Sequence, residues 1–147
     1  MIFRGLLKSA KIVAVSPDVA AGTTTIEPVT IDMAGYRSCL IIAYLGDVTA
    51  TAVPHLQAKA ADTNTVGTAI AGTAALAAAG ASDYDDKLMI LDVVNVRQRY
   101  LSPSLARTTA NVAVNGIIAI LYDARNVPVT QGSDVIDGTS LSNPAAV

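Results

Sequence analysis

The chain of 147 residues is long enough for one domain with a substantial core, and its single cysteine excludes both an internal disulfide and a cysteine-based metal site. Apolar residues make up 52% of the chain and charged residues only 15%, which favours a protein that covers part of its surface with another subunit. The net charge of −2 argues against a nucleic-acid partner, which would select for a basic face.

The N-terminal residues 1–9 form a short arm of mixed composition. They lack the long apolar region and the small-residue cleavage site of a signal peptide. No run in the sequence reaches the roughly 18 apolar residues that a membrane span needs. We therefore expect neither standard secretion nor insertion into a membrane. The unpaired cysteine fits assembly in a reducing cytoplasm.

The next part of the chain predicts two strands. Residues 11–15 are a short apolar strand that ends at Ser16-Pro17-Asp18, a strong turn signal. Residues 20–25 are expected to form a loop. Residues 26–31 then predict a weak strand with three spaced β-branched residues, and Pro28 indicates that this strand lies at a sheet edge.

Two clearer strands follow a turn at residues 32–35. The apolar run 36–45 predicts a strong strand that ends at Gly46-Asp47. Residues 51–60 alternate strictly, and one parity is small or apolar: Ala52, Pro54, Leu56, Ala58 and Ala60. The other parity contains His55, Gln57 and Lys59, so one face of this strand is predicted to meet the core and the other to meet water or a partner.

The alanine-rich segment 66–81 is ambiguous. Alanine has the best helix propensity, but the three glycines and the threonines of this segment weigh against a long helix. We favour two short irregular strands, with a short helix across residues 73–79 as the alternative. The acidic segment 82–86 that follows lacks the spacing of a calcium loop, so a solvated loop is favoured over a cation site.

Three further strands are predicted over residues 88–96, 100–107 and 112–122. The last of them is apolar at every position from Ile117 to Tyr122, which is typical of a strand that is buried on both faces. Asn115-Gly116 within it marks either a hairpin turn or a bulge.

The pattern as a whole predicts an all-β domain. About eight strands with regular turn signals favour an antiparallel β-sandwich or jelly roll over alternating βαβ units. The domain is expected to span residues 10–128, between an extended N-terminal arm (1–9) and an extended C-terminal arm (129–147). The C-terminal arm is polar with a few spaced apolar residues, so we expect it to become ordered along a neighbouring surface.

The residues needed for catalysis or metal binding are too few. The only histidine, His55, lies in the middle of a predicted strand, where a surface or interface role is favoured over a catalytic base or a zinc ligand. Cys39 is expected to be a buried free thiol. Neither a glycine-rich phosphate loop nor a facing carboxylate pair is present, since Asp85 and Asp86 are adjacent. We therefore predict no enzyme activity, no catalytic or cofactor-binding residues, no metal and no cofactor.

Three arginines, Arg97, Arg99 and Arg107, form the one basic cluster of the sequence. Asp92 and Asp123 lie nearby along the chain and could neutralise it. Salt bridges at strand ends are favoured over phosphate binding.

Several stretches in their order along the chain carry a family resemblance. These are DMAGYRSCLIIAYLGDVTAT, then AIAGTAA, then LMILDVVNVRQRYLSPSLART, and finally NGIIAILYDARNVPVTQ. In this order the chain, over roughly residues 11–131, resembles the decoration or cement proteins of tailed-bacteriophage capsids.

The resemblance implies a jelly-roll or related β-sandwich on the outside of an icosahedral head. It implies a virion structural protein that is made in the host cytoplasm, binds the major capsid protein and forms a homotrimer. Residues 1–9 and 129–147 would then be arms that contact the capsid or a neighbouring copy. The alternatives are another virion component, such as a head fibre, neck or tail protein, or a carbohydrate-binding sandwich module, which the lack of tryptophan disfavours.

Overall fold

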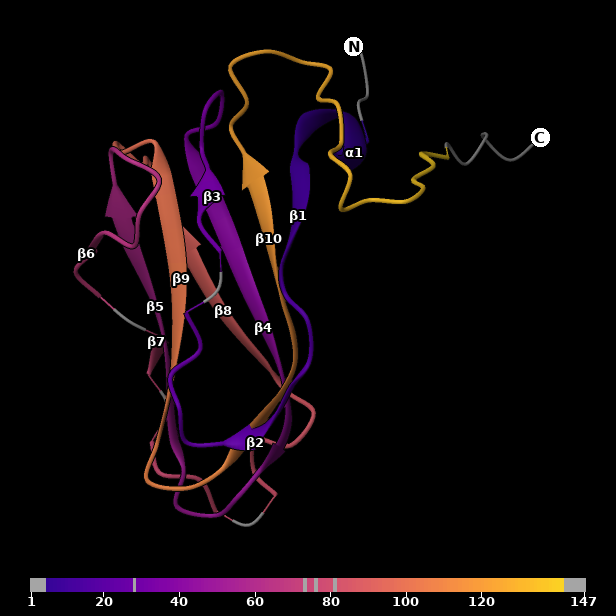
Figure 1. Ribbon diagram of the computed structural model, residues 1–147. Coiled ribbons are helices and arrows are strands. Elements are labelled where there is room, and N and C mark those ends of the chain that lie inside the picture. The colour runs from indigo at the N-terminus through magenta and orange to yellow at the C-terminus, as the bar shows by residue number, and fades with distance from the viewer. Residues whose placement is uncertain (1–4, 28, 73, 76, 81, 142–147) are drawn as a thin grey trace.

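Two antiparallel sheets pack face to face in the computed structural model of the chain, which is shown in Figure 1. The structure describes residues 5–27, 29–72, 74–75, 77–80 and 82–141. Sheet A consists of β1 (Lys11–Ser16), β2 (Val19–Gly22), β4 (Ser38–Val48), β8 (Leu88–Val93) and β10 (Val112–Tyr122). Sheet B consists of β3 (Ile31–Asp32), β5 (Val53–Ala61), β6 (Thr68–Ala69), β7 (Ala74–Ala75) and β9 (Tyr100–Thr108).

The strand order is that of a jelly roll. In sheet A the order is β1-β10-β4-β8, and β2 continues the pairing of β1 along β10. In sheet B the order is β3-β9-β5-β6, and β7 pairs with the same strand as β6. We now count β1 with β2 as one interrupted strand, and β6 with β7 as another, and number the resulting eight strands of the described chain from 1 to 8 in chain order. The strand order is then 1-8-3-6 in sheet A and 2-7-4-5 in sheet B. This arrangement of eight strands in two sheets is the double Greek key of the jelly roll, as the sequence predicted.

The core lies between the two sheets and is formed by every second residue of the long strands. Its largest fully buried aliphatic side chains are Ile41, Leu45, Leu56, Leu101, Leu105, Ile117 and Leu121. Small residues separate them, such as Ala43 on β4, Ala58 on β5 and Ala119 on β10. Because large and small side chains alternate, the two sheets can interdigitate although no aromatic ring is fully buried among the described residues.

Several predicted elements are confirmed. In β5 the side chains of Pro54, Leu56, Ala58 and Ala60 are buried, as is Ala52 just before the strand, while the other parity of β5 is half-exposed. The alanine-rich segment forms two short strands, β6 and β7, and the prediction for Thr73, Leu76 and Ala81 lies outside the described residues.

Asn115-Gly116 marks a bulge rather than a hairpin turn. The register of β10 against β4 shifts between Val114 and Gly116. Gly116 has a φ of +152°, a conformation that suits glycine far better than residues with a side chain.

Some predicted boundaries are wrong. The segment 20–25, predicted as a loop, begins inside β2. In the weak strand predicted at residues 26–31, only Ile31 belongs to a strand and Ile26 makes an isolated bridge to Leu105; Pro28 lies outside the described residues. The strand predicted over 88–96 ends at Val93, because Asn95 has a φ of +55° that leaves the extended region.

Strand β4 does not end at Gly46-Asp47 but continues to Val48. Gly46 is buried beneath Asn115, and a Cβ at this position would lie only 2.8 Å from Asn115 Oδ1. The glycine therefore serves close packing beside the β10 bulge instead of ending the strand.

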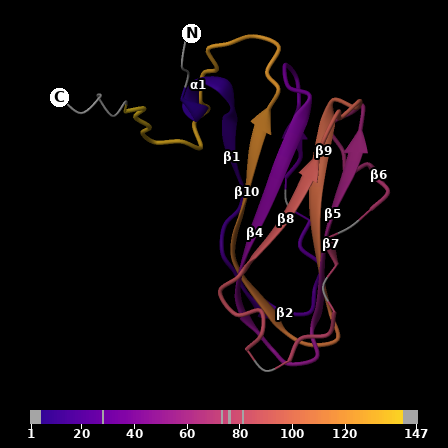
Figure 2. The same ribbon diagram turned by 180° about the vertical axis from the view of Figure 1, so that it is seen from behind.

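The described N-terminal and C-terminal segments, residues 5–9 and 129–141, come together at one corner of the sandwich. Within the N-terminal arm, Leu6–Ser9 form a single helical turn, α1. The C-terminal segment returns to the same corner, where Val129 is buried and its amide donates to the carbonyl of Lys8. Figure 2 shows this segment leading away from the sandwich on the side of β1. Of the residues that the structure describes, none belongs to a helix long and apolar enough to cross a membrane.

Candidate interaction surface

The outer side of sheet A, the side turned away from the core, is apolar. Across β10, β4 and β8 the register places Ile118, Ile42 and Ile90 side by side. The neighbouring rows add Tyr44 beside Leu88 on one side and Leu40 beside Ile120 on the other. We call this surface the outer apolar face and define it by seven residues: Leu40, Ile42, Tyr44, Leu88, Ile90, Ile118 and Ile120.

This face is open to solvent in the single chain. The exposed fractions are 56% for Leu88, 51% for Ile90, 43% for Tyr44 and 42% for Ile118. A sandwich normally places polar residues on its outer faces, because water covers them. A contiguous apolar patch on the outside of a domain is typical of a surface that another protein covers.

The prediction that residues 117–122 are buried on both faces is therefore wrong for the isolated chain. Ile117, Ala119 and Leu121 are fully buried in the core, whereas Ile118 and Ile120 point to the outer apolar face. The physical reason is that β10 belongs to a two-layer fold, and no described segment forms a third layer over sheet A. The sequence of β10 is typical of a strand that is packed on both sides, but no described segment packs against its outer side.

A polar group borders the face near β8. The Tyr122 hydroxyl donates a hydrogen bond of 2.6 Å to Asp92 Oδ1. This bond to a carboxylate, together with burial, raises the pKa of Tyr122 to about 12. Tyr122 on β10 thus reaches Asp92 on β8 across the intervening strand β4, and the two side chains form a polar rim at one end of the outer apolar face.

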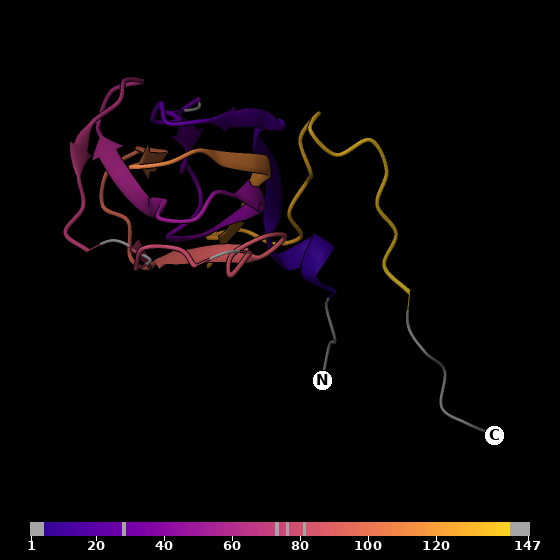
Figure 3. The ribbon, with the colours of Figure 1, turned by 90° about the horizontal axis from the view of Figure 1, so that it is seen from below.

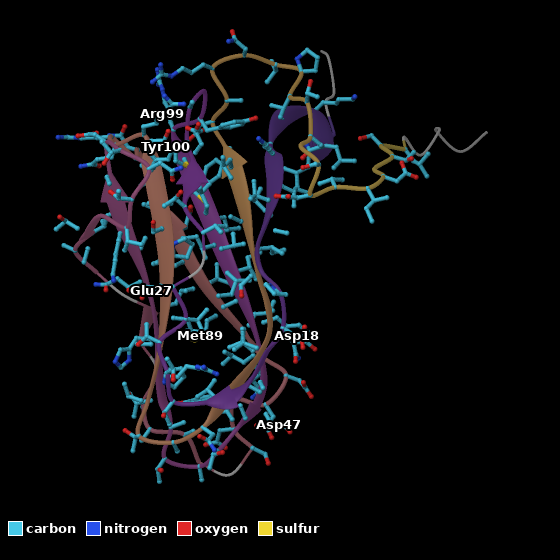
Figure 4. All side chains as sticks on the ribbon, viewed as in Figure 1. Asp18, Glu27, Asp47, Met89, Arg99 and Tyr100 are labelled. Carbon is cyan, nitrogen blue, oxygen red and sulfur yellow. The ribbon has the colours of Figure 1, made fainter. Side chains whose placement is uncertain are left out.

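The arginines of the sequence do not form one cluster. Arg99 makes a two-pronged salt bridge with Asp32, through Nε at 3.1 Å and through a terminal nitrogen at 2.9 Å, and its guanidinium lies 5.2 Å from the centre of the Tyr100 ring. The pairing with Arg99 lowers the pKa of Asp32. Figure 4 shows Arg99 and Tyr100 at the upper end of the molecule. Arg97 is exposed.

Arg107 lies at the other end of β9 and is buried. Its Nε donates to the carbonyl of Thr24 (2.7 Å), and one terminal nitrogen donates to the carbonyls of Ala20 (2.8 Å) and Val112 (2.7 Å). This side chain therefore ties the segment that contains β2 to strand β10. It serves the fold and is not available to an anionic ligand.

The carboxylates expected to neutralise the arginines have other partners. Asp92 accepts from Tyr122, and Asp123 accepts from the Ser38 hydroxyl at 2.8 Å. Among the described residues the salt bridges are Arg99–Asp32 and Lys59–Glu27. The prediction of strand-end salt bridges is thus right for Arg99, but the partner lies on β3 and not on the neighbouring chain segments.

The residues considered for catalysis lie apart. Cys39 is fully buried on the core side of sheet A, and burial, with a smaller effect of Asp92, raises the pKa of its thiol to about 12. His55 lies on the outer side of sheet B, opposite Ala106, and its Nδ1 has no hydrogen-bond partner among the described residues. The structure thus does not bring a base to the thiol.

The acidic loop 82–86 stabilises turns. Asp83 accepts a hydrogen bond from the amide of Gly80 (2.9 Å), and Asp85 accepts one from the amide of Val48 (2.8 Å). These carboxylates are therefore engaged with the backbone. No group of three or more metal-ligating side chains is found within the part of the chain that the structure describes.

The C-terminal segment covers the free edge of β1. Gln131 Oε1 accepts from the amide of Ile12 (2.9 Å), and Asp134 Oδ2 accepts from the amide of Ala14 (3.2 Å). Gln131 Nε2 also donates to the carbonyls of Leu7 (2.9 Å) and Ala10 (2.7 Å). These side chains take the place of a neighbouring strand, which blunts the edge against unwanted pairing. Sequence reasoning missed them, because no local pattern links residues so far apart.

Beyond Asp134 the segment presents apolar side chains to solvent. Ile136 is fully exposed (101%) and Leu141 nearly so (90%). Leu6 on α1 lies in the same corner and is exposed as well. Two apolar surfaces without a cover are thus present on one molecule: the outer apolar face and this terminal corner.

Comparisons with known proteins give no family for this chain. No family model matches it, and no curated protein matches it.

Proposed function

We propose that this protein is a non-catalytic structural protein that works by binding other proteins, and specifically that it is a decoration (cement) protein of a tailed-bacteriophage capsid. The observation that carries the binding role is the outer apolar face. Strands β4 and β10 have apolar side chains on both sides, and the chain itself covers only one of them. A contiguous exposed apolar surface of this kind is typical of one that a partner covers, because covering it removes apolar area from water.

The more specific part of the proposal rests on the sequence resemblance, and the jelly roll agrees with it. The partners are the major capsid protein and further copies of the chain, as a homotrimer on the outside of the head. A trimer that contacts several capsid subunits at once gains affinity by effective concentration, although each contact alone is weak. The terminal arms enlarge the footprint without a larger core.

The test is co-sedimentation of the purified protein with heads that lack it, followed by measurement of the copy number per head. We expect saturable binding at hundreds of copies, and saturated heads should retain their DNA at higher temperature than bare heads. A copy number of a few to some dozens would instead indicate a head fibre, neck or tail component. A protein that does not sediment with heads would contradict the proposal.

A truncation tests the role of the C-terminal arm in the same assay. Removal of the whole arm from residue 129 would also remove buried Val129 and the hydrogen bonds of Gln131. The better variant therefore ends at Val135. We expect this variant to fold and to bind heads more weakly than the full chain. Unchanged occupancy of the heads would show that the arm contributes nothing to binding.

A further inference from the structure

We propose that the C-terminal segment of one copy covers the outer apolar face of the next copy. The occupant of the face is thus a second copy of this chain, through residues 135–141. The contact joins two different surfaces, the terminal corner of the donor and sheet A of the acceptor. This inference extends the proposed function. The expected number of three copies is taken from the proposed function, whereas the contact itself is argued from the geometry described below.

The first argument is complementarity in chemistry. The acceptor surface offers Leu88, Ile90, Tyr44 and Ile118, each more than two-fifths exposed, in adjacent rows of one sheet. The donor offers Ile136 and Leu141, both exposed, with Gly138 between them. Association would remove both sets of apolar side chains from water, at about 25 cal/mol for each Å² of apolar surface buried.

The second argument is length. Strands in a sheet lie ~4.8 Å apart, so the outer apolar face, which lies on β10, β4 and β8, is about 10 Å wide. The seven residues 135–141 can span up to ~23 Å when extended. The segment is therefore long enough to lie across all strands of the face and to bring Ile136 and Leu141 over different strands.

The third argument is the path of the segment in its own molecule. Gln131 and Asp134 hold it at the outer edge of β1. It then passes α1, where a Cβ on Gly138 would lie 3.3 Å from Leu7 and one on Gly5 would lie 2.8 Å from the Ser140 hydroxyl oxygen. Seen from below, in Figure 3, the segment stands clear of the sandwich. Its apolar residues Ile136 and Leu141 are thus exposed and do not cover the outer apolar face of their own molecule.

The geometry also determines the kind of assembly. Donor and acceptor are different surfaces on one chain, so the contact is heterologous, and each copy can give its segment to one neighbour and receive a segment from another. Such contacts either continue as a filament or close into a ring. A closed ring of three copies is the homotrimer of the proposed function.

The test uses two variants of the full chain, in purified form and without heads. The tail variant is Ile136→Asp with Leu141→Asp, and the face variant is Leu88→Asp with Ile90→Asp. The control is Val66→Asp, which changes an exposed valine (47%) in the loop after β5 on the other sheet. Mass is measured by light scattering, and folding is checked by circular dichroism.

We expect the wild type and the control to be trimers and each variant alone to be a monomer. The decisive sample is the mixture of the two variants. The tail variant keeps an intact face and the face variant keeps an intact tail, so the mixture should form a 1:1 dimer that grows no further. A mixture that stays monomeric, a monomeric wild type, or a tail variant that keeps the wild-type mass would overturn the proposal.

A cross-link covers the case in which the face variant does not fold. The variants Ile136→Cys and Ile90→Cys, each with one added cysteine, are mixed and oxidised mildly. Native Cys39 is buried and does not compete. A disulfide-linked pair that contains one chain of each kind supports the contact. In the control, Val66→Cys replaces Ile90→Cys, and no mixed pair should form. Absence of the mixed pair would contradict it. If the protein forms trimers that do not bind heads, only the proposed function is contradicted. If a monomer binds heads, only the contact between copies is contradicted.

Discussion

At the scale of single residues, the most informative side chain is Arg107. It is buried and donates hydrogen bonds to three backbone carbonyls, those of Thr24, Ala20 and Val112. A planar fork of donors can satisfy several acceptors at once, which a lysine cannot imitate. The arginine was singled out in the sequence as part of a basic cluster, yet its position at the far end of β9 from Arg99 gives it a purely structural role.

We predict that Arg107→Met destabilises the protein by about 3–5 kcal/mol, because the acceptors would stay buried without donors. The free energy of unfolding is measured by urea denaturation. Arg97→Met is the matched control, since Arg97 is exposed, and it should change stability by no more than about 0.5 kcal/mol. Equal effects of the two substitutions would contradict the structural role of Arg107.

A second prediction at this scale concerns the thiol of Cys39. Its side chain is fully buried and its pKa is raised to about 12, so at pH 8 only about one thiol in 10⁴ would be ionised. Since the thiolate is the reactive form, we expect almost no reaction with Ellman's reagent in the folded protein. The reaction should be complete in about 6 M guanidinium, which unfolds most domains. Val66→Cys adds an exposed thiol as a positive control. Rapid labelling of native Cys39 would show that β4 opens.

At the scale of elements, the features that could be predicted from the sequence are those that a local residue pattern determines, namely the buried face and the bounds of a strand. The period of two in β5 identified its buried parity, and the long apolar run of β10 identified its bounds, Val112–Tyr122. Boundaries that depend on distant contacts were missed: β4 passes through Gly46 because Asn115 packs against it. The outer apolar face was not predicted. The sequence indicated that β10 is buried on both faces, whereas the two-layer fold leaves the outer side of this strand uncovered.

The edge of β1 gives the prediction at this scale. Gln131→Ala removes one acceptor from the amide of Ile12 and one donor from the carbonyls of Leu7 and Ala10. We expect a loss of about 1–2 kcal/mol in the free energy of unfolding. Amide hydrogen exchange of Ile12 should accelerate, while that of core strand β4 should change only as far as global stability does.

Thr130→Ala is the control for the edge, because Thr130 is exposed and adjacent to Gln131. It should leave the exchange of Ile12 unchanged. If Gln131→Ala also left that exchange unchanged, the C-terminal segment would not be covering the edge of β1 in solution.

At the scale of the whole molecule, the two uncovered apolar surfaces have one thermodynamic consequence. A chain that buries its outer apolar face only against another copy is stabilised by association, and by mass action its stability then depends on protein concentration. We predict that the Tm of the wild type rises when the protein concentration rises from the low micromolar range by two orders of magnitude. The Tm of the Leu88→Asp/Ile90→Asp variant should not change over the same range.

Calorimetry at several concentrations measures this dependence, and the Val66→Asp variant must behave as the wild type does. The variant pair also separates two effects that a single melting curve would confuse. Aspartate on an exposed face costs the monomer little, so at the lowest concentration the face variant and the wild type should melt close together and diverge only as association begins. A constant difference at all concentrations would mean that Leu88 and Ile90 stabilise the fold itself, and the outer apolar face would then not need a second molecule to cover it.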